Sequence, residues 1–248
     1  MDILVIGDLH GVSIKIDVLK IPDIAIQLGD LSNYGEPDII ENLISELVTQ
    51  LDPVPLLVIP GNHDIYGLND IFAAFQRFNK LVKRAGAIPL MEGPLILEEI
   101  GIVGVPGWYD YSLAPGYLNM TKDEYEIKAF GFRRLEDADY IKSSLSDEEL
   151  VRWNLNLLEK FISEIRESVN DVILALHFAP FKDSLKYTGN PEIDYFSAYM
   201  GSQRFGEFAL RHNIGLIVHG HTHRSIEYYI GKTKVVSVGL RETELISL

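Results

Sequence analysis

The sequence predicts an α/β fold, and two features of its hydrophobic pattern indicate this class. Five short runs of Ile, Leu and Val are each bounded by turn residues, which is typical of strands that are covered on both faces of a sheet. The runs occupy residues 2–6, 23–28, 55–59, 172–176 and 215–218. Segments with apolar residues at helical spacing separate several of these runs, and strands that alternate with helices favour an α/β architecture.

Helices are predicted for residues 38–51, 70–84 and 146–168, where apolar residues recur at helical spacing. The second of these segments ends in basic residues, which suit the negative end of a helix dipole. The third begins with Ser146 and has Glu149 three residues later, which is the pattern of a capping box. Thr121 and Glu124 repeat this pattern at the start of residues 121–130, where we expect a further short helix.

Two β-hairpins are predicted in addition to the alternating strands and helices. Residues 95–105 read as one hairpin that turns near Glu99 to Gly101, and residues 226–238 read as another around Gly231 and Lys232. Antiparallel hairpins beside the other strands indicate mixed sheets. Residues 106–145 are rich in Tyr, Gly and charged residues, and we expect loops and short helices inserted between core elements. Because no repeat or linker is evident, we expect residues 1–248 to form one domain.

The composition excludes several classes of site. The chain of 248 residues contains no cysteine, so disulfides and thiolate metal sites are excluded. Its formal net charge of -14, with no dense basic run, does not favour nucleic acid as a partner. The segment MDILVIGDLHG has no basic region followed by a long apolar run, so it does not read as a secretory signal. No apolar run reaches the roughly 20 residues of a membrane span, and we expect a soluble cytoplasmic protein.

Polar residues that can bind metal ions follow nearly every predicted strand. Carboxyl ends of parallel strands meet at one edge of a sheet, where α/β folds bind ligands. Carboxylate, amide and imidazole groups that converge without sulfur suit a divalent metal such as Mn, Fe, Zn, Co or Ni. The residues in question are Asp8, His10, Asp30, Asn62, His63, His177 and the histidines within 219–223.

The order of these residues matches five motifs of a known family. The motifs are Asp8-x-His10, Gly29-Asp30, Gly61-Asn62-His63-Asp64, a lone His177 and Gly220-His221-x-His223. Single motifs of this kind occur by chance, but five in this order, each after a predicted strand, are highly specific. From residue 8 to residue 223 the chain resembles the calcineurin-like metallophosphoesterases. The resemblance implies a four-layer α/β/β/α sandwich of two mixed sheets, with the active site at the strand ends.

The resemblance also implies two divalent metal ions, with manganese as the first expectation. Carried over from the family, Asp30 bridges both ions, and the hydroxide that attacks phosphorus also bridges them. Such an ion pair clamps a phosphate and lowers the pKa of bound water. One ion would be held by Asp8, His10, Asp30 and His223, and the other by Asp30, Asn62, His177 and His221.

His63 resembles the catalytic histidine of the family and would bind a phosphate oxygen or donate a proton to the leaving group. Asp64 is a second catalytic candidate, with a role in orienting a neighbouring loop or histidine. Many family members have Asp three residues after the bridging Asp, where it supports the catalytic histidine, but this chain has Asn33 there. An amide can hold a histidine by a hydrogen bond, but it cannot stabilise an imidazolium by charge.

Asn62 and His63 are also expected to bind substrate, and three further candidates lie outside the motifs. Trp108 and Tyr109 fall in a region that forms part of the rim of the site in this family. Aromatic residues that close a loop onto the core are an equal alternative for these two. Arg224 follows the last metal ligand and could reach a phosphate, but a solvated surface charge is an equal interpretation.

The expected activity is hydrolysis of a phosphate ester, with a phosphomonoesterase as the first choice. The partner would be a small phosphate ester or a phosphorylated substrate. The alternatives are a phosphodiesterase for cyclic or short nucleotides, a nuclease, or a binding scaffold that has lost turnover. The motifs do not choose the ester class or the oligomeric state.

His219 has no counterpart among the family's ligands, although it alternates with His221 and His223. A position just behind the site, supporting a carboxylate or another histidine, is one interpretation. A core histidine that is bonded to the backbone is the slightly favoured one.

Overall fold

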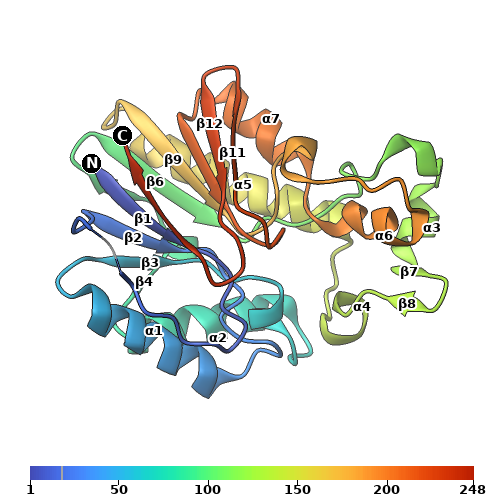
Figure 1. Cartoon of the computed structure of the whole chain (residues 1–248), viewed down its shortest axis with the longest axis horizontal. Helices are drawn as coiled ribbons and strands as arrows, with labels where there is room; N and C mark the ends of the chain where they lie inside the picture. Colours follow the sequence, from blue (N-terminus) through green and yellow to red (C-terminus); the bar gives the residue numbers. More distant parts are fainter. Residues whose placement is uncertain (18) are drawn as a thin grey trace.

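The computed structural model describes residues 1–17 and 19–248 and contains two large mixed β-sheets (Figure 1). The first sheet has the strand order β13-β1-β2-β3-β4. Strands β1 to β4 are parallel, and β13 pairs antiparallel with β1. The strands are β1 (Asp2–Ile6), β2 (Ile24–Gln27), β3 (Leu56–Val58), β4 (Ile88–Pro89) and β13 (Thr243–Ser247).

The second sheet has the order β11-β12-β10-β9-β6-β5. Its four inner strands are parallel, and the antiparallel edge strands β11 and β5 belong to the two predicted hairpins. The first hairpin turns at Glu98 and Glu99, one residue earlier than predicted. The strands are β5 (Leu95–Leu97), β6 (Ile100–Val105), β9 (Asp171–Leu176), β10 (Leu216–His219), β11 (Ile226–Ile230) and β12 (Thr233–Ser237).

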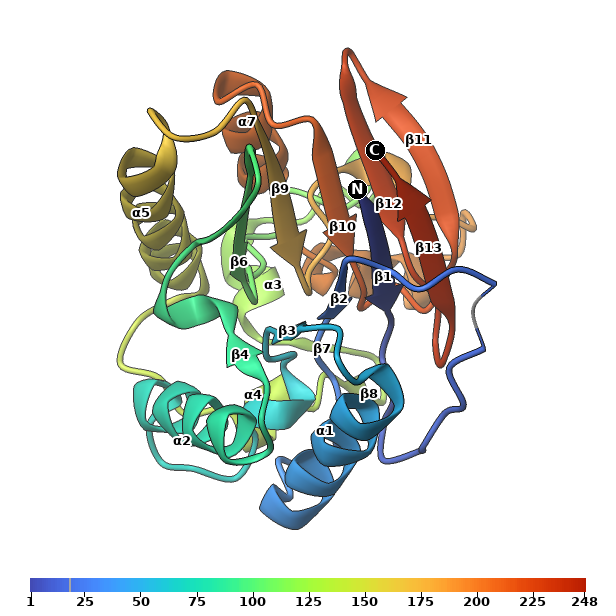
Figure 2. The same cartoon turned by 90° about the vertical axis from the view of Figure 1, so that its left-hand side faces the viewer.

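The long helices lie on the outer faces of the two sheets (Figure 2). The helices α1 (Pro37–Leu51) and α2 (Ile71–Arg84) cover the first sheet, and α5 (Asp147–Ile165) and α7 (Gln203–Arg211) cover the second. Asp70 caps α2, and Ser146 and Glu149 form the predicted capping box of α5. The α5 helix ends three residues before the predicted boundary. The four-layer α/β/β/α sandwich is therefore confirmed.

The alternation of side chains along β1 explains why the layers stack in this way. Ile3 and Val5 point into the core between the two sheets, whereas Leu4 and Ile6 point toward α1 and α2. Successive residues of a strand face opposite sides, so a strand that is apolar at every position needs cover on both faces. Full burial of each such side chain stabilises the fold by about 1.5–3 kcal/mol.

Residues 107–146 form short elements beside the sandwich, toward the right of Figure 1. These elements are α3 (Lys122–Glu126), β7 (Ala129–Phe130), β8 (Arg133–Arg134) and α4 (Asp137–Tyr140). Thr121 and Glu124 form the predicted capping box of α3, but the helix is shorter than predicted, and residues 129–130 are in β7. Nearby lies α6 (Pro191–Asp194), from the long connection between β9 and β10.

Aromatic packing attaches residues 107–146 to that long connection. The ring of Tyr125 stacks on the ring of Tyr195 with centroids 5.3 Å apart, and the Tyr199 hydroxyl donates to the Tyr125 carbonyl oxygen at 2.7 Å. All three tyrosines are buried. Packing of these buried aromatic side chains therefore fixes residues 107–146 to the connection between β9 and β10.

No helix in the described part of the chain combines the length and the apolar character needed to cross a membrane.

Candidate metal centre

The predicted ligands follow the carboxyl ends of five parallel strands, and the structure brings them together. Asp8 and His10 follow β1, Asp30 follows β2, and Asn62 follows β3. His177 follows β9 in the second sheet, and His221 and His223 follow β10. Because these strands all run toward one edge of the sandwich, residues that are distant in sequence converge there.

The backbone is strained at four of these positions. His10, Asp30, His221 and His223 have positive φ angles of 46°, 53°, 64° and 54°. Few residues other than glycine adopt this left-handed region, although Asp and His do so more often than most. Strained backbone of this kind clusters at functional sites, where it aims side chains that regular structure could not aim. The left-handed backbone conformation at these four residues directs their side chains toward a common point.

The first ligand group comprises Asp8, His10, Asp30 and His223, whose ligand atoms all lie within 4.8 Å of one another. The His10 Nε2 lies 3.1 Å from the His223 Nε2 and 3.6 Å from the Asp30 Oδ2. The His223 Nε2 lies 3.2 Å from the Asp8 Oδ2. Two carboxylates and two imidazoles that converge in this way form a donor set that fits a divalent cation.

The second group comprises Asp30, His177 and His221, and Asn62 lies beside it. The His177 Nδ1 donates to the Leu28 carbonyl oxygen at 2.8 Å. Its Nε2 faces the Asp30 Oδ2 at 3.4 Å and the Asn62 Oδ1 at 3.1 Å. The His221 Nε2 is buried and has no hydrogen-bond partner among the described residues. Since a buried polar atom without a partner is costly, a cation bound by that nitrogen would satisfy it.

Asp30 belongs to both groups, and its two oxygens have different neighbours. Its Oδ1 accepts a hydrogen bond from the backbone N–H of His63 at 3.0 Å. Its Oδ2 is the oxygen that faces both the His10 Nε2 and the His177 Nε2. The observed residues therefore fit a pair of ions that share Asp30, as the resemblance implies.

Neighbouring charges and burial shift the pKa values of the site histidines in different directions. Burial alone would lower the pKa of His177, but the carboxylates of Asp30 and Asp8 raise it to about 9. Burial and the neighbouring His177 hold the pKa of His221 well below its usual value. Burial would raise the pKa of the Asp30 carboxyl, but His177, His63 and His10 lower it far below its usual range. The His221 ring is therefore neutral, whereas His177 would have to lose a proton to bind a cation.

His63 lies beside the ligand cluster and is held by the main chain of Asn33. The His63 Nδ1 donates to the Asn33 carbonyl oxygen at 2.9 Å, and its ring lies edge-on to His10 at 4.9 Å. The Asn33 side chain instead donates to the His10 carbonyl oxygen at 3.1 Å. Burial lowers the pKa of His63, but the Asp30 carboxylate and the Asn33 carbonyl outweigh it, and the pKa is raised. The expected support of His63 by residue 33 is present, but through its carbonyl.

Comparison with known proteins agrees with this geometry. The model of the calcineurin-like phosphoesterase family matches residues 1–225. The chain belongs to this family. It is 22% identical over 225 residues to an uncharacterised protein of Acanthamoeba polyphaga mimivirus, covering 86% of this chain and 77% of the relative.

Solved structures of calcineurin-like fold share this architecture at low sequence identity. The phosphopantetheinyl hydrolase from Mycobacterium tuberculosis matches with a TM-score of 0.73 and 18% identity, over 97% of this chain and 90% of that protein. A putative 5'-nucleotidase from Staphylococcus aureus matches with a TM-score of 0.52 and 13% identity, over 99% of this chain and 50% of the nucleotidase. At these identities the likeness concerns the fold.

Asp64, the other predicted catalytic residue of this calcineurin-like phosphoesterase, is buried and serves the backbone. Its carboxylate accepts hydrogen bonds from the backbone N–H groups of Gly61 at 3.0 Å and Ser32 at 2.9 Å. Burial and the nearby Asp30 raise its pKa to about 7. These contacts tie the loop after β2 to the loop after β3, which agrees with the predicted orienting role and not with contact to substrate.

Three predicted substrate-binding residues do not line the cavity that opens over the ligands between Asp30, His63 and residues 133–137. Trp108 and Tyr109 are only 1% and 0% exposed, and the Trp108 Nε1 donates to the Asp147 Oδ1 at 2.8 Å. Arg224 is exposed, and it does not line this cavity. The burial of the two aromatic residues fits their alternative interpretation as residues that close a loop onto the core.

His219 is a core histidine. Its Nδ1 donates to the Gly220 carbonyl oxygen at 3.0 Å, and its Nε2 accepts from the Ser184 hydroxyl at 2.8 Å. Burial lowers its pKa to about 4, so the ring stays neutral. The slightly favoured interpretation, a core histidine bonded to backbone, therefore agrees with the structure.

The structure adds residues that the sequence did not single out. A cavity of about 400 Å³ opens over the ligands, and one side of it is formed by residues 133–137 together with Phe196 and Met200. Asp137 is buried there and accepts a hydrogen bond from Asn62. None of these residues belongs to a motif. For residues 133–137 the available signal was the richness of residues 106–145 in Tyr and charged residues, and Phe196 and Met200 lie outside that segment.

Proposed function

We propose that this protein is a phosphoesterase that depends on two divalent ions, with manganese as the first candidate. The observation that carries the proposal is the sharing of Asp30 between two ligand groups. One of these groups contains the His221 Nε2, a buried atom that has no hydrogen-bond partner among the described residues. When bound, a pair of ions would supply a nucleophilic water of lowered pKa and offset the charge on the phosphoryl oxygens.

His63 is proposed as the residue that handles the proton. Its Nδ1–H is committed to the Asn33 carbonyl oxygen, so the Nε2 is the atom that is free to contact a phosphate oxygen or the leaving group. The raised pKa of His63 keeps a larger fraction of it protonated near neutral pH. A protonated ring could bind the anion and then donate to the leaving oxygen.

The cavity supports a substrate that is larger than inorganic phosphate. Arg133 and Phe196 line it, with the guanidinium 5.0 Å from the ring centroid. An aromatic ring next to a cation suits a substrate with an apolar or planar part beyond its phosphate. We therefore propose a small phosphate ester, with a monoester as the first choice.

A phosphodiester remains the enzymatic alternative, because the proposed nucleophile can attack either ester class. The two solved structures above carry names of different hydrolases, so fold similarity does not choose a substrate for this chain. A scaffold without turnover is the non-enzymatic alternative. The presence of His63 and of every predicted ligand in one cluster argues against it.

The test is hydrolysis of p-nitrophenyl phosphate and bis-p-nitrophenyl phosphate by chelator-treated protein to which one metal is returned at a time. We expect turnover of the monoester with Mn²⁺ and a loss of activity after chelation. Turnover of the diester alone would shift the proposal to a phosphodiesterase. No turnover of either ester with Mn²⁺, Fe²⁺, Zn²⁺, Co²⁺ or Ni²⁺ would favour the scaffold.

A further inference from the structure

Asp137 joins the short elements beside the sandwich to the candidate metal centre. It is the first residue of α4 and is only 3% exposed. Its Oδ1 accepts hydrogen bonds from the Asn62 Nδ2 at 2.8 Å and from the Tyr66 hydroxyl at 2.5 Å. The Asn62 Nδ2 also lies 3.2 Å from the Tyr66 hydroxyl oxygen. Both neighbours of the Asn62 amino group can thus accept its protons.

This arrangement decides which way the Asn62 amide points. An ionised carboxylate only accepts hydrogen bonds, so the amide nitrogen must be the atom that faces Asp137. The amide oxygen then faces the opposite way, toward the His177 Nε2 at 3.1 Å. An amide rotated by half a turn would present N–H groups, which repel a cation, to the second ligand group.

We propose that Asp137 is a positioning residue that holds the Asn62 amide oxygen toward the second ion. The proposal rests on the proposed function, since it assumes that this group binds a metal. Residues behind metal ligands commonly fix ligand orientation, and their loss typically weakens metal binding about 10- to 100-fold. Here Asp137 has this role. It lies 75 positions after the ligand Asn62, in a segment that contains none of the family motifs.

Neighbouring contacts hold Asp137 in place. The Tyr140 carbonyl oxygen accepts from the Gly67 N–H at 3.4 Å, and the Lys142 carbonyl oxygen accepts from the Ile71 N–H at 2.9 Å. The ring of Tyr140 stacks on the ring of Tyr66 with centroids 5.2 Å apart. These contacts fasten α4 to the chain that follows the Asn62 loop, so the acceptor and the ligand it orients belong to one packed unit.

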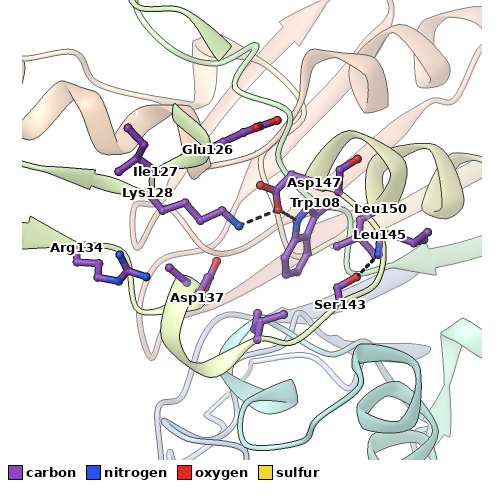
Figure 3. Close-up of a pocket in the computed structure, with 13 residues that line it drawn as sticks. Trp108, Glu126, Ile127, Lys128, Arg134, Asp137, Ser143, Leu145, Asp147 and Leu150 are labelled. Atoms are coloured by element: carbon purple, nitrogen blue, oxygen red, sulfur yellow. Dashed lines mark hydrogen bonds and ion pairs between the residues drawn. The ribbon is translucent and has the colours of Figure 1, made fainter. Parts of the chain in front are cut away.

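Asp137 also stands between two cavities. The cavity over the metal ligands and a second cavity of about 400 Å³, which is drawn in Figure 3, share Arg134 and Asp137 as lining residues. In the second cavity Lys128 and Trp108 both donate to the Asp147 Oδ1, so these two donors are bound to Asp147 and not to Asp137. The Asp137 Oδ1 accepts from Asn62 and Tyr66, and the buried Tyr109 hydroxyl also faces this carboxylate.

The experiment is calorimetric titration of chelator-treated full-length protein with Mn²⁺, with Asp137→Ala and Asp137→Asn as the paired variants. Asp137→Ala should weaken one of the two binding events by about 10- to 100-fold and leave the other within about threefold. Asp137→Asn removes the charge but keeps an oxygen that can accept from Asn62, so both events should stay within about threefold of the original protein. Asp123→Asn, an exposed change in α3, controls for net charge.

Two results would overturn the proposal. One is that Asp137→Ala binds both ions as tightly as the original protein does. The other is that Asp137→Asn and Asp137→Ala weaken ion binding equally, because this result would assign the effect to the charge of Asp137. If Asp137→Ala does not fold, Asp137→Leu fills a similar volume without an acceptor and must show the same selective weakening. Binding of fewer than two ions by the original protein would instead contradict the proposed function, so the two failures are distinguishable.

Discussion

The Nε2 atoms of His10 and His223 lie 3.1 Å apart, although 213 positions separate these residues in the chain. The Asp30 Oδ2 lies 3.6 Å from the first nitrogen, and the Asp8 Oδ2 lies 3.2 Å from the second. Two neutral imidazoles that face each other through lone pairs repel unless a proton or a cation lies between them. A hydrogen bond between the two rings is compatible with this distance, and we propose that both rings are ligands of one ion because each also faces a carboxylate.

This pairing predicts the effect of removing one partner. His223→Ala should abolish tight binding of one ion and leave the other, because His177 and His221 belong to the second group. Titration with Mn²⁺, together with metal analysis after gel filtration, would measure the stoichiometry. His212→Ala, at the end of α7, is the matched control, since it removes a histidine that bonds Glu159. Retention of both ions by His223→Ala would show that His223 is not a ligand.

Asp30→Asn should weaken binding of both ions, because one carboxylate oxygen faces both groups. The amide keeps the volume and one acceptor oxygen but removes the charge that both cations need. Each ion is expected to bind at least about tenfold more weakly, the low end of the loss seen when metal sites lose supporting groups. Two ions that remain tightly bound in this variant would exclude the bridging role.

His63→Ala should separate catalysis from metal binding. The His63 side chain bonds the Asn33 carbonyl oxygen and belongs to neither ligand group. We expect two ions to bind as before, and kcat for p-nitrophenyl phosphate to fall by about 10²- to 10⁴-fold, the usual contribution of a proton-transfer residue. A variant that loses an ion would mark His63 as a ligand.

Metal binding should depend steeply on pH because of His177. Its pKa is about 9 in the metal-free site, above the usual value near 6.5 of a free imidazole. A cation must displace that proton, so affinity at the second group should rise about tenfold per pH unit up to pH 9 and then level off. Calorimetry at pH 7.5 in buffers of different ionisation enthalpy should detect release of about one proton per ion at this group. Absence of proton release would contradict this protonation state.

The same shift affects the stability of the metal-free protein. A histidine whose pKa is raised by folding stabilises the folded state fully below its unfolded pKa, and this contribution is lost as the pH rises through the folded pKa. For His177 the loss falls between about pH 6.5 and 9. The His177 contribution to the free energy of unfolding of chelator-treated protein should therefore decrease over this range. His177→Gln should flatten the pH profile measured by urea titration.

The layers and the ligand cluster could be predicted from the sequence because both follow from strand patterns. A strand that is apolar at every position requires cover on both faces. In β1, Leu4 packs toward α1 and α2, and Val5 packs into the core between the two sheets. Parallel strands end at one edge, so polar residues just past them had to converge. For these features, local pattern and global fold agree.

Other features could not be predicted, because they depend on tertiary contacts that leave no periodic signal. Asp137 resembles any acidic residue of a charged loop until α4 packs beside Tyr66. The support of His63 by Asn33 comes from a carbonyl group, which every residue has, so the side chain at that position carried no information. Trp108 follows the strand β6 and was expected with equal weight at the rim or in the core, and only the packing of α5 decides for the core.

The distance in sequence between Asp8 and His223 also has a consequence in time. A nascent chain presents Asp8 early, but the first ligand group lacks a member until residue 223 has left the ribosome. Contacts between such distant segments form late, because closing a long loop must precede any gain from them. Newly made protein should therefore bind an ion at the first ligand group only after residue 223 has been synthesised.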